Sequence, residues 1–384
     1  MFLKFCVMKK SILLLIGISC VFALSQCNTI ELSNGGNHDD GTLIDPIDPT
    51  TPVDYSLIAF IASGGEEGGL YTMNFLGNDK RKIIDTVGYG KPVRSHCGKQ
   101  LIFATSKFDT FVGEDNSVNF INPQQGLYFV NTDGTGLTTI ERMNEFGYFA
   151  NADWSPDDTQ IVYVKSDYYN GVDLILYNGS TQKQKILTNK AQISSPKFSP
   201  DGKQIVYTAT VDAGSSIYKI DVNGKNDQIF IKNAGIPVWS PQGDKIAYSA
   251  SGKERSYQIF VADADGGNQK QLTFTMSSQR WPGDWPIDGN YDPQWTPDGK
   301  KIVYVSHENV KPEIFIMNAD GSKQTRLTTA EFRDEHPEIT LEGKYIIFTS
   351  RRSDMMDNGI CIMTLEGKNQ KVLSKTGIFP VACR

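Results

Sequence analysis

Apolar residues along this chain fall in short runs that alternate with polar turns, and residues 55–384 show no sustained helical period. Runs such as Lys301–Ser306 and Glu313–Asn318 are rich in β-branched and aromatic residues, as strands are. Ser-Pro-Asp-Gly at 199–202 and Asn-Ala-Asp-Gly at 318–321 stand between such runs. Proline presets the second position of a turn and glycine closes it, so these sequences predict tight turns.

The strand–turn pattern repeats through residues 55–384. The clearest copies begin at Pro196 and Pro293, where a Pro-x-aromatic segment, a turn and an Ile-Val-Tyr strand follow in the same order. A unit of about 43 residues with two enlarged copies fits a blade of four strands. We therefore predict an all-β fold, a seven-bladed β-propeller in one domain. The aromatics that close the second strand of each copy are Phe60, Phe103, Tyr163, Tyr207, Tyr248, Tyr304 and Phe348.

The two ends of the repeat region complement each other. The first copy starts at Ser56 and lacks its Pro-x-aromatic strand, whereas the chain ends with the Pro-initiated segment Phe379–Arg384. We expect this segment to supply the missing strand and to close the ring within one composite blade. Closure limits the exposed sheet edges that would otherwise invite aggregation.

These residues resemble the WD-like propeller repeats of the TolB family, which are similar to those of dipeptidyl-peptidase-type propellers and oligogalacturonate lyases. The resemblance covers about 55–384 and is strongest from Ala152 to Leu327. It implies the propeller fold, but the same blades serve binding and catalysis in different proteins.

The enlarged connections all belong to one face. Connections after strands two and four of a blade emerge on one side of the ring, and those after strands one and three are the tight turns. Loops on a rigid scaffold commonly carry binding function, so we expect a ligand on the long-loop face. The enlarged connections are predicted at Lys107–Gln125, Glu141–Asn151, Phe274–Asp292, Thr329–His336 and Arg351–Asn358.

An aromatic insert, Arg280–Asp292, is the most unusual segment on that face. Trp281, Trp285 and Tyr291 in a surface loop can stack on sugar rings or grip a peptide. The alternative is a loop that folds its own aromatics over the central channel.

Charged residues are predicted at the channel mouth. Asp292 and His336 each precede the Pro that opens a first strand, and Arg333 and Arg351 should lie near them. Such a mouth can bind an anionic ligand or supply acid–base groups, and the alternative is a set of salt bridges between blades. His307 opens a loop on the same face without an obvious partner. His96 is expected to be a plain surface residue on the opposite face.

Charge and motifs narrow the functional classes. A formal charge of −6 and a pI near 5.4 argue against nucleic-acid binding. No nucleophile elbow, phosphate loop or metal-binding helix motif occurs, so we predict no cofactor. Asp288–Asp292 has the alternating oxygens of a calcium loop but lacks the later bidentate Glu, because Gly299 takes that position. Calcium therefore stays an open alternative.

Three of the six Cys residues fall in the repeat region. Cys97 and Cys383 lie near the ends of first strands in adjacent blades, where a disulfide is conceivable in an oxidising compartment. Cys361 falls in a third strand and is expected to be a buried thiol.

The first 27 residues read as an export signal. Lys9 and Lys10 precede an apolar run that is too short to span a bilayer comfortably, and Leu24–Cys27 resembles a bacterial lipobox. We predict lipidation at Cys27, with a plain secretory signal as the alternative. Residues 28–54 are rich in Gly, Asp and Pro and are expected to form a flexible tether. The folded body is then 55–384.

Two functions remain open on sequence grounds. The first is a lipid-anchored binding or scaffold propeller of the bacterial envelope, periplasmic or at the cell surface, that engages a glycan or an envelope protein through its long-loop face. The second is a polysaccharide lyase or hydrolase with its site at the same channel mouth.

Overall fold

The computed structural model describes residues 57–62, 68–85, 90–112, 118–143, 147–167, 171–211, 214–252, 256–275, 289–308, 311–329, 331–352 and 358–383. Their regular structure is all β-strand. None of these residues belongs to a helix long and apolar enough to cross a membrane. By its internal contacts Val53–Arg384 is one compact unit.

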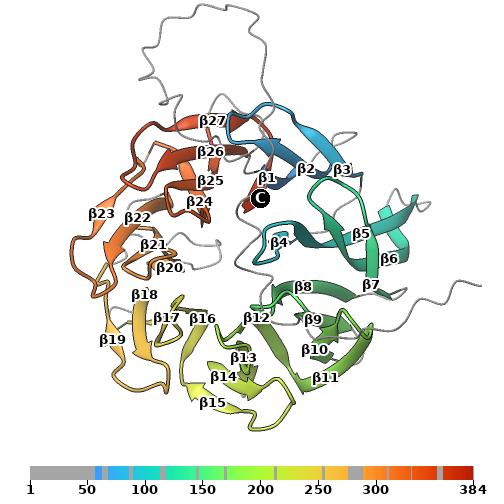
Figure 1. Ribbon diagram of the computed structural model, residues 1–384, viewed down its shortest axis with the longest axis horizontal. Coiled ribbons are helices and arrows are strands. Elements are labelled where there is room, and N and C mark those ends of the chain that lie inside the picture. Colours follow the sequence, from blue (N-terminus) through green and yellow to red (C-terminus); the bar gives the residue numbers. More distant parts are fainter. Residues whose placement is uncertain are drawn as a thin grey trace, which may run out of the picture. The chain divides into compact units, whose positions relative to one another are not determined.

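The strands form seven four-stranded antiparallel sheets around one axis, so the predicted seven-bladed propeller is confirmed (Figure 1). The first strand of each blade is the innermost, and we call it the axial strand. From the axial strand outward, blade 1 is β28 (Ile378–Cys383), β1 (Leu57–Ala62), β2 (Gly69–Asn74) and β3 (Arg81–Ile84). Blade 2 is β4 (Val93–Arg94), β5 (Gln100–Val112), β6 (Val118–Asn131) and β7 (Thr138–Met143).

The other five blades follow in chain order, each again from the axial strand outward. Blade 3 is β8 (Gly147–Trp154), β9 (Gln160–Asp167), β10 (Gly171–Asn178) and β11 (Lys183–Lys190). Blade 4 is β12 (Gln192–Phe198), β13 (Gln204–Val211), β14 (Gly214–Asp221) and β15 (Gln228–Ile231). Blade 5 is β16 (Ala234–Trp239), β17 (Lys245–Ser251), β18 (Tyr257–Asp263) and β19 (Lys270–Gln271). Blade 6 is β20 (Asn290–Trp295), β21 (Lys301–Ser306), β22 (Glu313–Asn318) and β23 (Thr325–Arg326). Blade 7 is β24 (Arg333–Ile339), β25 (Tyr345–Arg351), β26 (Gly359–Thr364) and β27 (Lys371–Ser374).

The core lies within and between the blades. The aromatic that closes each second strand is buried, and it stacks within its own blade where the third strand offers a ring. Tyr207 lies 5.6 Å from Tyr218, and Tyr248 lies 5.5 Å from Phe260, between ring centroids. Because alternate residues of a strand point to opposite sheet faces, one strand serves two neighbouring cores. Tyr207 packs toward blade 3, whereas the adjacent Val206 packs toward blade 5.

The C-terminal strand closes the ring, as the ends of the repeat predict. β28 pairs antiparallel with β1, and Leu57 lies opposite Cys383. Val381, Ala382 and Cys383 are buried. Blade 1 therefore joins the first and last strands of the propeller.

The tight turns after first and third strands lie on one side of the ring, which we call the turn face; the opposite side is the loop face. In the turn that follows β12, the Gly202 amide donates to the Ser199 carbonyl at 2.8 Å, and Gly202 has a φ of 70°. Glycine adopts such a φ at no steric cost, which explains its place in the motif, and Asp158 takes the same place in blade 3 with a φ of 56°.

Three of the predicted enlarged loops are wrong in part. The second half of 329–336 is strand, because β24 begins at Arg333. Much of 107–125 is strand, because β5 and β6 continue as a hairpin in which Asp109 lies opposite Ile121. Most of 141–151 is also strand, since β7 ends at Met143 and β8 begins at Gly147. In these stretches the strands continue to pair beyond their predicted ends, and local composition does not reveal this pairing.

A β-bulge interrupts six axial strands at the same place. The residue at each bulge has a left-handed φ between 50° and 55°, and in five of the six strands a proline follows it. Proline cannot donate to a ladder, so it is accommodated at bulges. The expectation that this proline opens the strand is wrong, because β20 and β24 begin before it. The bulge residues are Asn151, Ser195, Ile236, Asp292, His336 and Phe379.

The cysteines of the propeller are free thiols, so the conceivable bond between Cys97 and Cys383 is not formed. Cys97 is exposed on the turn after β4, whereas Cys383 is buried in β28. Burial raises the pKa of the Cys383 thiol to about 12. Cys361 is buried in the third strand of blade 7, as predicted.

Candidate functional site

Asp292 and His336 hold the same position in neighbouring blades, at the bulges of β20 and β24. Their φ angles of 53° and 55° are unfavourable for residues other than glycine. Both side chains are half-buried. The fold therefore holds a carboxylate and an imidazole on adjacent axial strands.

The His336 imidazole is held in an environment that disfavours its charge. Its ring centroid lies 4.5 Å from that of Phe379 on the next axial strand. Burial lowers the pKa of His336, against the opposing influence of Asp292 and Glu335, and Lys91 adds to the decrease. The ring is consequently neutral at pH 7 and can accept a hydrogen bond.

An ion pair lies beside this histidine. Lys91 Nζ, just before β4, lies 2.8 Å from Glu338 Oε2 of β24, and Arg94 Nε lies 3.7 Å from Glu338 Oε1. Burial raises the pKa of Glu338, but Lys91 and Arg94 outweigh burial and hold it below its ordinary value. Burial likewise lowers the pKa of Lys91, while Glu338 and Asp292 bring it above its usual range. Both groups are therefore charged at neutral pH.

A second polar network lies nearer the loop face. Tyr291 Oη lies 3.1 Å from His307 Nε2 and donates to Glu335 Oε1 at 3.3 Å. Glu335 Oε1 is in turn 3.8 Å from Arg333 Nη2. Burial raises the pKa of Tyr291, and the Glu335 carboxylate adds to the increase. The phenol therefore stays protonated and acts as a hydrogen-bond donor.

This network corrects two expectations from the sequence. Tyr291 is not an aromatic of a surface loop, because it belongs to β20 and is only 9% exposed. It cannot present its ring to a sugar. His307 does have a partner, since it contacts Tyr291 across the β20–β21 pair, with ring centroids 5.6 Å apart.

Arg333 and Arg351 are brought together at the loop-face end of blade 7. They are register partners in the antiparallel pair of β24 and β25, and both are exposed. Like charges directly opposite each other repel. Arg333 is near Glu335, whereas Arg351 forms no ion pair with any residue in the described ranges. The pair therefore offers positive charge to an anion.

The remaining predicted site residues fall elsewhere. Arg280, Trp281 and Trp285 lie outside the described residues, so the aromatic insert stays a prediction. Asp288 of the suggested calcium loop also lies outside them. Asn290 is fully buried and donates from Nδ2 to Gln258 Oε1 at 2.9 Å. No cluster of three or more His, Cys, Asp or Glu side chains suited to a metal occurs among the described residues.

Lys91, Arg94 and Glu338 were not foreseen from the sequence. A usable signal was present, because the residue after the bulge proline is often charged or polar, as in Lys197, Gln294 and Glu338. Side chains at that position are half-buried on the axial strands. A repeat of polar residues at one place of an otherwise apolar strand marks the side facing the axis.

Comparison with known proteins agrees with this architecture. The family model described as "TolB beta propeller domain" matches residues 110–291 and 237–379. The chain belongs to the TolB β-propeller domain family. An uncharacterized protein of Agrobacterium fabrum is 26% identical over 238 residues, which are 59% of this chain and 75% of that protein.

Two further TolB-family matches differ in extent. The Tol-Pal system protein TolB of Thioalkalivibrio sulfidiphilus is 29% identical over 121 residues, which are 31% of this chain but only 25% of that protein. The crystal structure of TolB from Acinetobacter baumannii has a TM-score of 0.52 at 18% identity and covers 86% of this chain and 83% of that one. The structural match shows a shared fold.

Proposed function

We propose that this TolB-family propeller is a binding module of the bacterial cell envelope that holds an acidic partner at its loop face. Its membership of the TolB propeller family supports a binding or scaffold role. The relatives named as Tol-Pal system proteins support an envelope location and a protein partner. An acidic glycan is the other candidate with the same chemistry.

The observation that carries the proposal is the pair Arg333 and Arg351. Two exposed arginines on opposed strands form a cationic patch at a fixed place, because both backbones are held in the ladder. Guanidinium binds carboxylate or phosphate through paired hydrogen bonds. The Tyr291–His307–Glu335 network, of which only Tyr291 is buried, holds Glu335 within 3.8 Å of Arg333. In this proposal Arg280, Trp281 and Trp285 add contacts from the insert between β19 and β20.

The Tyr291–His307–Glu335 network also favours a second candidate, a lyase or hydrolase at the same place. A phenol hydrogen-bonded to both an imidazole and a carboxylate is an arrangement that can transfer protons. Because the Tyr291 side chain is buried, this role requires substrate to reach His307 or Glu335 instead. Turnover therefore separates the candidates.

The test compares the protein with an Arg333→Gln/Arg351→Gln double variant. Polygalacturonate serves as the acidic glycan and dextran as the neutral control, and solubilised envelope proteins are tested in parallel by affinity capture with mass spectrometry. We expect the native protein to retain one acidic partner and the variant to lose it. Each charged hydrogen bond that is removed should weaken the binding free energy by about 1.5–3 kcal/mol. The matched control is Arg81→Gln/Lys183→Gln, which removes two exposed charges from outer strands.

Two outcomes contradict the binding proposal. If the arginine variant retains the acidic partner as well as the native protein does, Arg333 and Arg351 are not part of the binding site. Cleavage of polygalacturonate that is lost in His307→Ala, with or without added divalent metal, establishes the enzymatic candidate. Replacing Trp281 and Trp285 by Ala should weaken binding and leave the melting temperature nearly unchanged if the insert contacts the partner.

Attachment to the membrane through Cys27 is part of the same proposal and has its own test. Labelled palmitate should enter the native protein in a bacterial host and be absent from Cys27→Ser. Retained label in that variant would assign the acyl group to another residue, such as Cys20. Release of unlabelled soluble protein from native cells would favour a plain secretory signal.

A further inference from the structure

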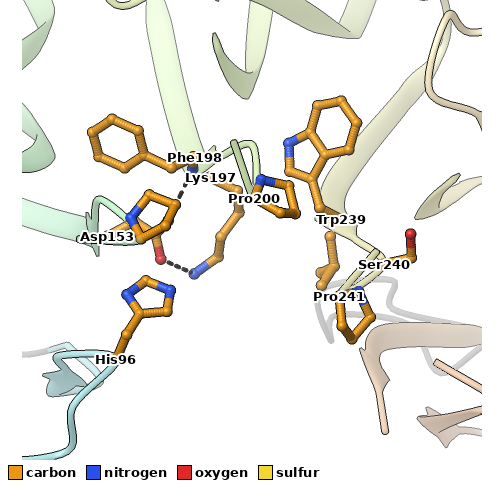
Figure 2. A pocket seen from close by; sticks show the side chains of 10 residues that line it. His96, Asp153, Lys197, Phe198, Pro200, Trp239, Ser240 and Pro241 are labelled. Atoms are coloured by element: carbon orange, nitrogen blue, oxygen red, sulfur yellow. Dashed lines mark hydrogen bonds and ion pairs between the residues drawn. The ribbon is translucent and has the colours of Figure 1, made fainter. Parts of the chain in front are cut away.

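A cavity of about 420 Å³ lies on the turn face, among the turns of blades 2 to 5 (Figure 2). Its size is within the range of small-ligand sites. We call it the turn-face cavity. It lies on the side of the ring opposite Arg333 and Arg351, so it is separate from the site proposed above. Its wall includes His96, Asp153, Lys197, Pro200, Trp239 and Pro241.

The charged groups of the cavity leave a hydrogen-bond donor open. Lys197 Nζ donates to Asp153 Oδ1 at 2.9 Å, and Asp153 Oδ2 accepts from the Phe198 amide at 2.9 Å. Both carboxylate oxygens are thus engaged. The Lys197 ammonium has three N–H groups, and its side chain is 35% exposed. In Figure 2 its nitrogen points into the open space beside His96.

Trp239 supplies a second donor, and comparison with its counterparts shows that it is unusual. Trp154 and Trp295 occupy the same place in blades 3 and 6, and each indole N–H donates to a carbonyl of the preceding blade, at 3.3 and 3.1 Å. Trp239 Nε1 is buried, yet it bonds to no residue in the part of the chain that the structure describes. A buried donor left without an acceptor costs free energy.

The other walls are apolar. Phe198 and the proline rings of Pro156, Pro200 and Pro241 line the space, with the indole of Trp239 beside them. Figure 2 shows the indole nitrogen on the side of the ring nearest Pro200. The cavity therefore combines an accessible donor, the Lys197 ammonium, with a hydrophobic surface, and the unbonded N–H of Trp239 is buried within a residue of its wall. The Asp153 carboxylate is already satisfied.

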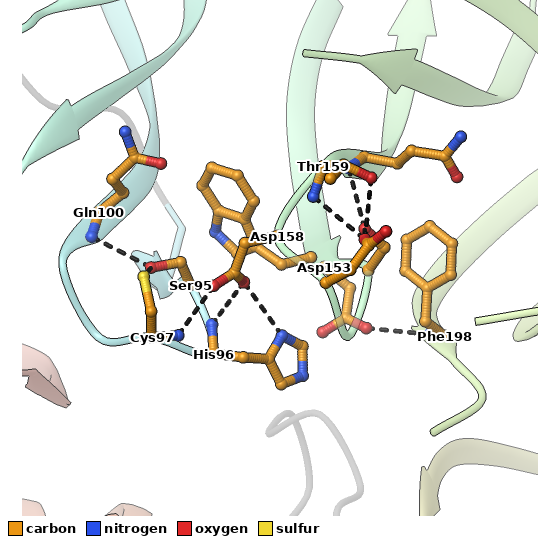
Figure 3. A network of polar contacts seen from close by, with 12 residues as sticks. Ser95, His96, Cys97, Gln100, Asp153, Asp158, Thr159 and Phe198 are labelled. Carbon is orange, nitrogen blue, oxygen red and sulfur yellow. Dashed lines mark hydrogen bonds and ion pairs between the residues drawn. The ribbon is translucent and has the colours of Figure 1, made fainter. Parts of the chain in front are cut away.

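His96 forms part of the rim and is fixed from outside the cavity. The sequence predicts only a plain surface residue, but its amide donates to Asp158 Oδ1 at 2.7 Å and its Nδ1 lies 3.3 Å from the same oxygen (Figure 3). The neighbouring Cys97 amide donates to Asp158 Oδ2 at 2.8 Å. These bonds hold the turn of blade 2 against blade 3, so the opening of the cavity has a defined shape.

We propose that the turn-face cavity binds a carboxylate attached to an apolar, preferably aromatic, body. The carboxylate accepts hydrogen bonds from Lys197 and Trp239. It thereby supplies the acceptors that these two donors lack within the protein. The body lies against Phe198 and the proline rings. A neutral ligand would leave the Lys197 ammonium without a new acceptor, and a carboxylate without a body would gain little from the apolar walls.

Two sources share this chemistry, a free aromatic acid and the C-terminal carboxylate of a peptide that ends in an aromatic residue. Isothermal titration calorimetry with phenylacetate and with acetyl-Gly-Gly-Phe tests them in parallel. The matched uncharged probes are phenylacetamide and acetyl-Gly-Gly-Phe-amide, and acetate is the control without a body. We expect each bound acid to exceed its amide by roughly tenfold or more in affinity. The tighter of the two acids identifies the source.

Trp239→Phe is the decisive variant, because it keeps an aromatic ring and removes only the free donor and part of the surface. It should weaken binding of the better acid by roughly tenfold. Trp295→Phe is the matched control and should leave affinity unchanged, because that indole N–H is already bonded to Val238. Lys197→Met should abolish the preference for acid over amide. Melting temperatures of all variants confirm that they are folded.

Three results would overturn the proposal. They are no binding of either acid up to its solubility limit, equal affinity for acids and amides, and full affinity in Trp239→Phe. None of these results bears on the loop-face patch, whose variants and probes are different.

Discussion

Lys91 and Glu338 form an ion pair of 2.8 Å that joins blade 2 to blade 7. Blade 1, which contains both the first and the last strand of the propeller, stands between these two blades around the ring. The ion pair therefore spans the seam at which the ring is closed. Its side chains are 32% and 15% exposed, so it is partly shielded from solvent.

Glu338→Gln tests the energetic value of this pair. We expect a loss of about 1–2 kcal/mol at pH 7, less than for a fully buried pair because solvent screens it. The folded-state pKa of Glu338 is lowered and that of Lys91 is raised. The native advantage is consequently lost as pH falls through the folded pKa of Glu338 and as pH rises through that of Lys91.

Thermal melts of both proteins from acid to alkaline pH check this prediction. The difference between them should be largest near neutrality and shrink at low pH. Lys203→Gln is the control, because Lys203 is 80% exposed and lies 3.6 Å from Asp201 within one turn. A pH-independent difference would show that Glu338 acts through packing alone.

Asp334→Asn is expected to stabilise the protein at neutral pH. Asp334 and Glu313, both buried, take the places that Asn290 and Gln258 hold one blade earlier, where the two amides bond at 2.9 Å. Burial raises the pKa of Asp334 to about 6. The folded state thus binds this proton more tightly than the unfolded state, so native stability falls as pH rises from about 4 to about 6.

The measurement is the melting temperature of Asp334→Asn at pH 4 and pH 7. We expect near equality at pH 4 and a gain of about 1 kcal/mol at pH 7. Asp320→Asn is the control and should destabilise the protein at pH 7. Hydrogen bonds from Ser322 lower the pKa of Asp320, so folding favours its charged carboxylate. A destabilised Asp334→Asn at pH 7 would mean that the charged carboxylate is needed, for example by Arg352.

The three equivalent tryptophans provide an internal series for the indole N–H. Trp→Phe removes the same volume at each place, so the variants differ chiefly in the hydrogen bond that is lost. Trp295→Phe and Trp154→Phe should each cost about 1 kcal/mol more than Trp239→Phe. Chemical denaturation of the ligand-free proteins measures this difference. Equal losses in all three would indicate that the Trp239 N–H has an acceptor in solution.

Sequence reasoning reached the ring and its closure because both depend on local signals. The aromatic of each second strand recurs at every blade, and a turn like Ser-Pro-Asp-Gly follows the axial strand in blades 3 to 6. A strand lacking at one end of the repeat was found at the other. The bulges escaped prediction, since the left-handed residues are as different as Ser195, Ile236 and Phe379. Proline marks the place, but only ladder pairing shows that the strand starts earlier.

The candidate site was predictable only in part for a related reason. Asp292 and His336 were placed together by their equivalent positions in the repeat. His307 contacts Tyr291 through the register of β20 with β21, and a single sequence does not fix register. Glu335 contacts Tyr291 from the neighbouring blade, through blade packing that no local pattern reveals. Likewise, the ion pair of Lys91 and Glu338 joins residues 247 apart in sequence, and no local pattern links them.

Removal of Phe379–Arg384 should destabilise the whole propeller. The deletion takes away most of β28 and its buried Val381, Ala382 and Cys383, and it exposes the edge of β1. We expect a loss of about 5 kcal/mol, judged from the buried side chains. Calorimetry should show one lowered transition, and removal of Arg384 alone is the control. An unchanged transition would mean that β28 is not required for closure.

The place of β1 in blade 1 determines how the propeller responds to force. β1 is a second strand, so Leu57 lies at the turn face and the preceding chain joins the ring there. A pull on that chain acts along the strand axis and loads the ladders to β28 and β2 in shear, so that their hydrogen bonds must yield together rather than one by one. In a membrane-anchored protein the six residues of β1 would carry the whole mechanical load. Blade 1, which closes the ring, would then also be the blade to which the force is applied.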